Sequence, residues 1–386
     1  MYNRRWVFFA ACLGMMVFGI VMLSLGTINT FITAKFQLND LSIASLASLL
    51  PLGILAGSLI FGPLVDRYGY KQLLIICALL IVVALEVIAY TKAFFLIRFS
   101  FFLIGIGGGA INGSTNALVA DISTEKKGAN LSLLGVFYGI GALGMPALIG
   151  ILSKFFAVEN LIGGIGIFVF LITILFSTLK FPAPKQAQGF PIKESVGLLK
   201  NGLLILLGMV LFFESGIEGL TNNWTTSFLQ RDLAVTPQRA LLALSLMVLG
   251  LTVARLVLGW ALKKMRAYIV LIVCLCLAML GSLLLRFAGG YPLAVTGLIL
   301  MGVGFAAGFP VILGYVGELF AQLSGTAFSI AFVIALIGNT FLNFILGLIS
   351  ANYGIQHYLT MIHISILIML ILLAILLPKI SRKITI

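Results

Sequence analysis

Long runs of hydrophobic residues, each ended by a short polar segment, follow one another along the whole chain. Most runs reach about 20 residues, the length that an α-helix needs to cross the hydrocarbon core of a bilayer. The runs are too long for barrel strands, and a backbone in lipid must satisfy its hydrogen bonds within the segment. The pattern predicts an all-α, polytopic membrane protein with twelve transmembrane helices. The predicted spans are 6–34, 41–65, 71–91, 93–122, 129–154, 160–181, 202–230, 237–262, 267–288, 291–318, 325–351 and 358–378.

The composition supports this class. Of the 386 residues, 61% are hydrophobic and 9% are charged, whereas a soluble domain carries about 25% charged residues. The net charge of +13 does not indicate nucleic-acid binding, because no segment forms a basic, solvated surface. Cys12, Cys77, Cys274 and Cys276 lie inside hydrophobic runs and lack the partners of a zinc site. We therefore expect a lipid-embedded monomer with no metal, no cofactor and no disulfide.

The distribution of Lys and Arg predicts the orientation. With the N-terminus in the cytoplasm, sixteen of the 24 Lys and Arg residues face the cytoplasm, six face outside and two lie within spans. Cytoplasmic loops of membrane proteins carry the excess of these residues. We therefore predict a multi-pass protein of the cell (inner) membrane with both termini in the cytoplasm.

The two halves of the chain come into register at an offset of 197 residues. Related pairs include Gly62 and Gly259, Gly105 and Gly302, Gly128 and Gly325, Gly141 and Gly338, and Asp121 and Glu318. Small residues recur in membrane helices because they allow close approach. The repeat predicts two parallel six-helix bundles around a central cavity near the bilayer midplane.

A polar segment rich in Pro, Gly and Gln separates the two halves. It follows the sixth predicted span and ends at about residue 200, and its composition suits a linker. We predict an N-terminal bundle at 1–181, a cytoplasmic linker at 182–201 and a C-terminal bundle at 202–386.

The loop after the second span reads Gly62-Pro-Leu-Val-Asp-Arg-Tyr-Gly-Tyr-Lys71. The pattern G-x-L-x-D-R-x-G-x-K resembles the signature loop between helices 2 and 3 of the major facilitator superfamily of transporters. The resemblance implies that this loop contacts the cytoplasmic ends of neighbouring helices and stabilises the outward-open state. The expected conformational latch consists of Gly62, Asp66, Arg67, Gly69, Lys71 and Asp121, with Lys126 nearby and Glu318 as the counterpart of Asp121. The second copy of the loop has Lys263 where the first has Asp66.

Ionisable side chains inside a span are costly and mark candidate functional sites. Glu214 lies near the middle of the seventh span, and Glu218 lies one turn further on the same face. Glu214 could form a structural ion pair with Arg255 of the eighth span, or it could couple transport to a cation, and the two roles are compatible. Two carboxylates one turn apart could share a proton or help to bind sodium.

Amide, hydroxyl and aromatic side chains within the spans form a second set of candidates. They offer the hydrogen-bond donors and acceptors that a polyol such as a sugar needs, although hydrogen bonding between helices would explain several of them. Trp224 could stack on a sugar or anchor the helix at the interface. The candidate substrate-binding residues are Asn29, Asn112, Asn116, Tyr138, Asn222, Asn223, Trp224, Asn339 and Asn343.

Three passages narrow the resemblance within the superfamily: the N-x-x-x-N arrangement that ends at Asn116, the start of the fifth span, and the seventh and eighth spans with Glu218 and Trp224. Together they look like the fucose/glucose-type symporters and the sodium-dependent glucose transporter-like proteins. The proton-coupled members carry a glutamate where this chain has Asn112. Any coupling charge is then expected from Glu214 and Glu218.

These observations favour a secondary active transporter that moves a small polar solute, a sugar, by alternating access and is coupled to a proton or sodium gradient. The alternative is an exporter of a drug-like, amphipathic compound. The sequence contains no clustered nucleophile, metal-ligand set or nucleotide-binding loop. We therefore expect neither an enzyme nor an ATP-driven pump.

Overall fold

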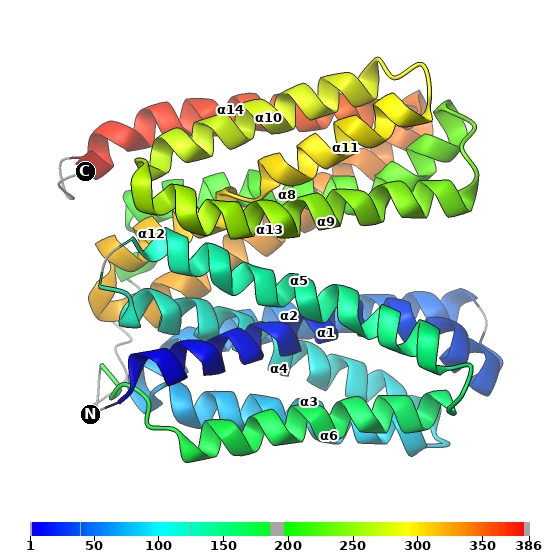
Figure 1. The fold of residues 1–386 in the computed structure, drawn as a ribbon, viewed down its shortest axis with the longest axis vertical. Coiled ribbons are helices and arrows are strands. Elements are labelled where there is room, and N and C mark those ends of the chain that lie inside the picture. The colour runs from blue at the N-terminus through cyan, green and yellow to red at the C-terminus, as the bar shows by residue number, and fades with distance from the viewer. Residues whose placement is uncertain (1, 39, 125, 186–196, 382–386) are drawn as a thin grey trace. The chain divides into compact units, whose positions relative to one another are not determined.

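The computed structural model describes residues 2–38, 40–124, 126–185 and 197–381. Within these ranges the regular structure is entirely helical (Figure 1). Twelve helical segments are long and apolar enough to cross a membrane, which confirms the predicted number of spans. The helices are α1 (Arg4–Phe36), α2 (Asp40–Tyr68), α3 (Tyr70–Tyr90), α4 (Phe94–Ile122), α5 (Lys127–Leu152), α6 (Val158–Thr178), α8 (Gly202–Asp232), α9 (Pro237–Lys264), α10 (Ala267–Arg286), α11 (Tyr291–Phe305), α12 (Gly308–Leu319), α13 (Ser324–Tyr353) and α14 (His357–Ser381), with a short 3₁₀ turn at Ala321–Leu323.

The residues group into two compact units by their contacts. The first unit comprises Met1–Ile122, Phe137–Ser195 and Gln322–Ser329, and the second comprises Ser123–Val136, Val196–Ala321 and Ile330–Ile386. The first turns of α13 therefore belong to the first unit, and the first turns of α5 belong to the second. The predicted limits of the two bundles, at residues 181 and 202, do not include this exchange of helix ends between the units. These limits stay a prediction. Much of the predicted linker, residues 186–196, lies outside the described part of the chain.

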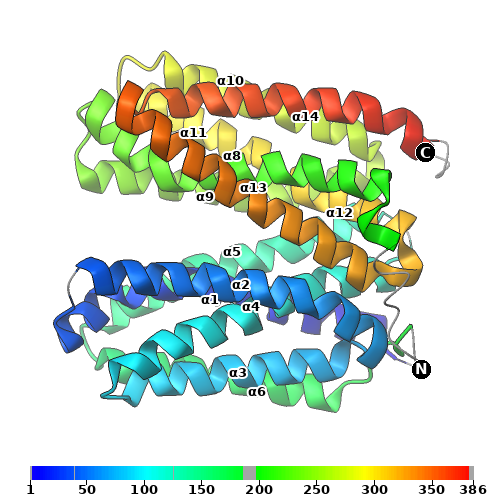
Figure 2. The same ribbon diagram turned by 180° about the vertical axis from the view of Figure 1, so that it is seen from behind.

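The two units share a pattern of helix contacts that follows the repeat. Seen from behind, α3 and α6 lie side by side in the first unit, as α10 and α14 do in the second (Figure 2). These are the third and sixth spans of each half. The repeat extends to single hydrogen bonds. In the first unit the Ser329 hydroxyl donates to the carbonyl oxygen of Ser58. In the second, the Ser132 hydroxyl donates to the carbonyl oxygen of Arg255 at 2.7 Å, and both donor and acceptor are shifted by the same 197 residues.

The tenth span is divided into two helices. α11 ends at Phe305 and α12 begins at Gly308. Pro310 has no N–H, so it cannot donate to the carbonyl oxygen of Ala306 four residues earlier. The N–H of Ala306 itself bonds to the carbonyl oxygen of Val303 at 3.3 Å, a tighter turn than an α-helix makes. A helix N-terminus therefore lies within the span, which the hydrophobic pattern alone did not indicate.

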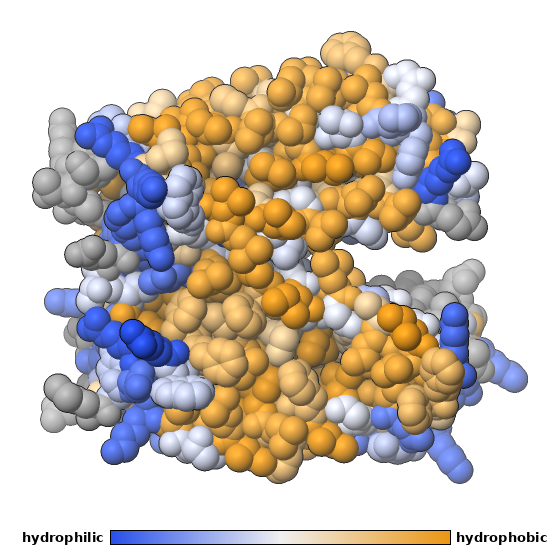
Figure 3. Space-filling view, in the orientation of Figure 1, coloured by the Kyte–Doolittle hydropathy of each residue, from blue (hydrophilic) through white to orange (hydrophobic). Residues whose placement is uncertain are grey.

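The surface of each unit fits a lipid environment. On the face that Figure 3 shows, hydrophobic side chains cover the flanks of the helices and hydrophilic ones gather near the helix ends. Large apolar side chains such as Ile151 on α5 and Ile371 on α14 are 63% and 60% exposed. Such continuous exposure of apolar side chains is expected where helices contact acyl chains rather than water.

Candidate functional site

Asp66, near the end of α2, holds the start of α13. Its side chain is 1% exposed. One carboxylate oxygen accepts a hydrogen bond from the N–H of Gly325 at 3.2 Å, and the other accepts from the N–H and hydroxyl of Thr326 at 2.9 and 2.7 Å. The first N–H groups of a helix lack intrahelical partners and favour negative charge. Asp66 therefore caps α13 from a helix about 260 residues earlier in the chain.

Gly62 allows this contact because the two backbones touch at its position. A Cβ atom on Gly62 would lie 2.6 Å from the carbonyl oxygen of Gly325 and 2.8 Å from the Cα atom of Thr326. Neither backbone atom can move aside cheaply, so a larger residue would push α2 away from α13. Gly62 lies one turn before Asp66 and brings its carboxylate within reach.

Asp121, at the end of α4, joins the same cluster. One of its carboxylate oxygens accepts a hydrogen bond from the Lys185 ammonium at 2.7 Å, and the other accepts from the Tyr70 hydroxyl. The Lys185 ammonium also donates to the hydroxyl of Ser324 at 2.6 Å. Ser324 is the first residue of α13, so Asp66 and Asp121 both act on the start of one helix.

The other residues of the predicted latch lie around this cluster or away from it. Gly69 adopts φ +81°, a left-handed conformation that favours glycine, and joins α2 to α3. The Arg67 guanidinium lies 5.3 Å from the ring centroid of Tyr68. The Lys71 ammonium donates to the carbonyl oxygen of Ser177 at the end of α6, at 2.6 Å. Lys71 therefore ties α3 to α6 and does not contact Asp66.

Glu318 and Lys126 lie outside the cluster. Glu318, next to the end of α12, is exposed and belongs to the second unit, where Lys127 is its electrostatic neighbour. Lys126 is exposed. Sequence reasoning missed Tyr70, Lys185, Ser324 and Thr326 as members of the cluster. One sequence feature could have indicated Ser324 and Thr326. They flank Gly325, which is the repeat partner of Gly128.

Glu214 lies in the interior of the second unit. It is 0% exposed, and neither carboxylate oxygen has a hydrogen-bond partner among the described residues. Its carboxylate lies against the first residue of α12: a Cβ atom on Gly308 would be 2.2 Å from the Glu214 carboxyl carbon. Only glycine leaves room here. A buried carboxyl group therefore faces the N-terminus that the division of the tenth span creates.

In the described structure, Glu214 and Arg255 do not form the ion pair that was one of the two roles suggested by the sequence. No nitrogen of Arg255 lies within 4.0 Å of a Glu214 oxygen. Arg255 is 6% exposed, and one guanidinium nitrogen donates to the carbonyl oxygen of Gly135 on α5 at 3.3 Å. It still acts electrostatically on Glu214 and Glu218, so the three charged groups share one neighbourhood.

Four of the candidate substrate-binding residues form one hydrogen-bonded network in the second unit. The side-chain oxygen of Asn343 on α13 accepts from the Asn223 amide and the Trp224 indole N–H of α8, both at 3.0 Å. The Asn343 amide donates to the side-chain oxygen of Asn339 at 3.1 Å. The Asn339 amide in turn donates to the carbonyl oxygen of Ser215 at 3.0 Å, directly after Glu214 in the chain.

Replacing Asn343 with Ala should destabilise the contact between α8 and α13. The change removes two hydrogen bonds that Asn343 accepts from α8 and two that it donates to Asn339 within α13. Each is worth about 1 kcal/mol net, so we expect the protein to lose about 2–4 kcal/mol of stability. The midpoint of thermal unfolding in detergent measures the effect. Asn352→Ala on the same helix is the matched control, because the exposed Asn352 amide donates only to Leu348 within α13. Equal midpoints for the two variants would contradict the network.

The remaining amide candidates lie in the first unit or at the edge of the network. The Asn116 amide donates to the backbone and side-chain oxygens of Asn112 at 2.9 and 3.1 Å, so the two residues share a helix face. The Tyr138 ring lies 5.7 Å from the ring of Phe18. Asn222 is exposed. The side chain of Asn29 lies outside the described part of the structure.

Comparison with known families gives a match over nearly the whole chain. The model of the Major Facilitator Superfamily matches residues 7–221 and 203–385.

Individual relatives agree. The glucose/mannose transporter GlcP of Bacillus subtilis is 24% identical over 345 residues, which are 85% of this chain and 84% of the relative. The multi-drug resistance efflux pump PmrA of Streptococcus pneumoniae is 26% identical over 150 residues, 38% of each chain. Among solved structures, the E. coli fucose:proton symporter FucP superposes with a TM-score of 0.81 at 18% identity, covering 95% of this chain and 98% of FucP. This last likeness establishes the fold.

Proposed function

The chain belongs to the Major Facilitator Superfamily of membrane transporters, and we propose that this member moves a sugar across the membrane and couples that movement to a proton or sodium gradient. A superfamily transporter is a multi-pass membrane protein and not an enzyme.

The proposal of a sugar rests on the amide network of the second unit and on the similarity to GlcP. Asn223 and Asn343 present amide groups beside the indole of Trp224. Amides donate and accept hydrogen bonds, as sugar hydroxyls do, and an indole offers a flat apolar face for the sugar ring. The glucose/mannose transporter GlcP aligns with 85% of this chain. Asn112 and Asn116 of the first unit are proposed to contribute further amides.

The observation that carries the coupling proposal is the unpartnered carboxyl group of Glu214. A buried carboxylate costs several kcal/mol unless hydrogen bonds or an opposite charge compensate it, and no described residue donates to it. A proton or a sodium ion would supply the missing compensation. Asn339 bonds to Ser215, the neighbour of Glu214. A solute that binds at the amide network can therefore change the surroundings of the Glu214 carboxyl group through α8 and α13.

The remaining parts of the proposal follow from the family and the charge pattern. We propose alternating access, in which the solute site opens to each side of the membrane in turn. We propose that both termini lie in the cytoplasm, and the distribution of Lys and Arg supports this orientation. We propose that the protein works as a monomer.

The test is transport by the purified, full-length protein in proteoliposomes. Radiolabelled glucose, mannose, fucose and xylose are offered under an imposed proton gradient, an imposed sodium gradient, or neither. We expect accumulation of at least one sugar under one of the gradients only. A second arm measures gradient-driven movement of ethidium, because the similarity to PmrA favours an exporter as the alternative. Movement of ethidium without accumulation of any sugar would replace the sugar proposal with the exporter.

A further inference from the structure

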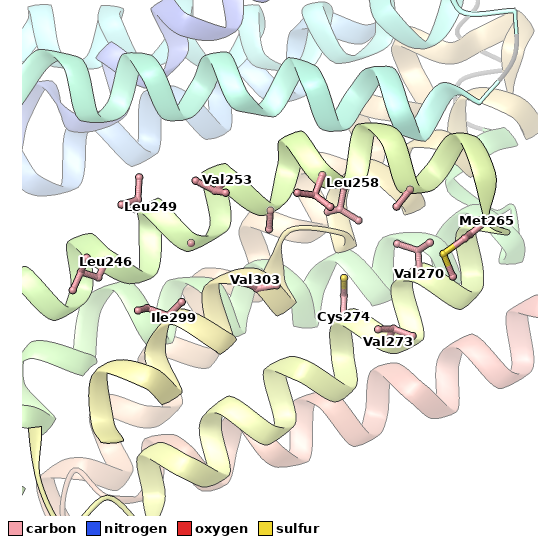
Figure 4. Close-up of a pocket in the computed structure, with 14 residues that line it drawn as sticks. Leu246, Leu249, Val253, Leu258, Met265, Val270, Val273, Cys274, Ile299 and Val303 are labelled. Carbon is pink, nitrogen blue, oxygen red and sulfur yellow. The ribbon is translucent and has the colours of Figure 1, made fainter. Parts of the chain in front are cut away.

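An apolar groove runs along the second unit between α9 and α10, with α11 at its base (Figure 4). Its volume is about 550 Å³, and no polar side chain lines it. On α9 the lining includes Leu249, Val253 and Val257, which are 47%, 50% and 59% exposed. An exposed apolar surface of this kind marks a site of contact with a membrane, a ligand or another protein.

The groove is long enough for a lipid chain. Its lining on α9 extends from Leu246 to Ala261, and fifteen steps of 1.5 Å give about 22 Å. One leaflet of a bilayer has a hydrocarbon depth of about 15 Å, half of the full 30 Å. An acyl chain that enters at one end of α9 therefore finds apolar contacts over its whole depth.

The turn that joins the two walls of the groove is strongly basic. α9 ends at Lys264 and α10 begins at Ala267, and Lys263, Lys264 and Arg266 are all exposed. Lys264 follows Val257 and Ala261 at helical spacing, so it continues the stripe of α9 residues that line the groove. None of the three cations forms an ion pair with a described acidic residue.

The basic side chains of the turn make contacts that do not neutralise their positive charge. The Lys264 ammonium lies 4.4 Å from the ring centroid of Trp260, and the Arg266 guanidinium donates to the Tyr268 hydroxyl at 3.3 Å. Both contacts orient a cation without neutralising it. A phosphate diester is the anion that would meet these side chains at the membrane surface.

This turn differs in charge from its counterpart in the first half of the chain. Residues 259–268 correspond to residues 62–71, where Asp66 uses its carboxylate to cap α13. Lys263 occupies the position of Asp66 in the second copy, and the segment 259–268 contains no acid. The second loop therefore cannot cap a helix N-terminus in this way, and its charge has the opposite sign.

We propose that the groove and the turn together bind an anionic phospholipid, with an acyl chain along α9 and the phosphate at Lys263, Lys264 and Arg266. The groove shares no lining residue with the clusters of Glu214 and Asp66, and the proposal does not depend on the transported solute. The lipid belongs to the leaflet at the α9–α10 turn, which the charge pattern predicts to be the cytoplasmic one.

Native mass spectrometry of the full-length protein tests the proposal. The protein is incubated with equimolar phosphatidylglycerol and phosphatidylcholine that carry identical acyl chains. We expect at least about tenfold preferential retention of phosphatidylglycerol, given three nearby cations. The triple variant Lys263→Gln, Lys264→Gln, Arg266→Gln should lose the preference. Equal retention of the two lipids by the wild type, or an unchanged preference in the variant, would overturn the proposal.

Two further variants separate the headgroup from the chain. The control variant Arg4→Gln, Arg5→Gln, Lys126→Gln removes three exposed cations predicted at the same membrane face and should keep the preference. Val257→Trp fills the groove from an exposed position and should lower the retention of both lipids. If Val257→Trp has no effect, or if inorganic phosphate competes as well as phosphatidylglycerol, the turn is a simple anion site and the proposed lipid site is wrong.

Discussion

Replacing Glu214 with Gln is expected to reduce gradient-driven accumulation of the solute to simple equilibration, while exchange of solute across the membrane continues. Glutamine has nearly the shape of glutamate, but it cannot take up and release a proton, and its neutral oxygen binds a cation weakly. The buried carboxyl group has no described hydrogen-bond partner, so the loss of charge breaks no existing bond. Proteoliposome accumulation and counterflow, measured on the same preparation, separate coupling from movement.

Two companion variants make this experiment specific. Gly308→Ala should also impair accumulation, because its methyl group would lie 2.2 Å from the Glu214 carboxyl carbon and would displace the side chain. Gly347→Ala on α13 is the matched control, since a Cβ atom there meets no atom within 4 Å. If Glu214→Gln accumulates solute as the wild type does, the coupling role of Glu214 is wrong, whatever the solute.

Replacing Asp66 with Ala is expected to produce the largest loss of stability of any single change at the cluster. The change leaves the N–H groups of Gly325 and Thr326 buried without their acceptor, at about 1–3 kcal/mol each. We therefore expect a loss of about 2–6 kcal/mol in the packing of α13 and a fall in the rate of transport. Hydrogen exchange at the amides of 322–329 reports the local effect directly.

Thr326→Val is the graded control for Asp66→Ala. It keeps the shape of the side chain and removes only the hydroxyl bond of 2.7 Å, so it should cost about 1.5–3 kcal/mol, the value for a hydrogen bond to a charged group. Asp66→Asn should fall between the two, because one amide oxygen still accepts while the NH₂ group meets a donor. Unchanged hydrogen exchange in Asp66→Ala would show that the cap does not hold α13.

The length and order of the hydrophobic runs alone predicted the twelve spans, and the helices begin and end within a few residues of the predicted limits. The spans can be predicted from the sequence because each segment that crosses a bilayer must be apolar over about 20 residues and must satisfy its own backbone hydrogen bonds. The repeat could also be found in the sequence, because the glycines and serines that allow close helix contact recur at one offset. The bonds of Ser329 to Ser58 and of Ser132 to Arg255 show that the offset is also structural.

The tertiary structure decided which partner each of the rare polar groups has. Asp66 and Asp121 were candidates from the sequence. Asp66 caps the first turn of α13, about 260 residues away in the chain, and Asp121 reaches that turn through Lys185. Nothing local distinguishes Thr326 from any other helix-terminal threonine. Likewise, the order of the spans puts Arg255 in the helix after Glu214, yet the Arg255 guanidinium contacts Gly135 on α5.

The sequence by itself therefore determined the membrane class, the number of helices and the small set of polar residues worth examining. Those properties depend on the solubility of short segments in lipid, which each segment carries within its own residues. The structure alone decided that Glu214 faces Gly308 at a helix N-terminus and that Asp66 caps α13. Hydrogen-bond partners and close backbone contacts depend on atoms brought together from distant parts of the chain, and no pattern within a single span contains that information.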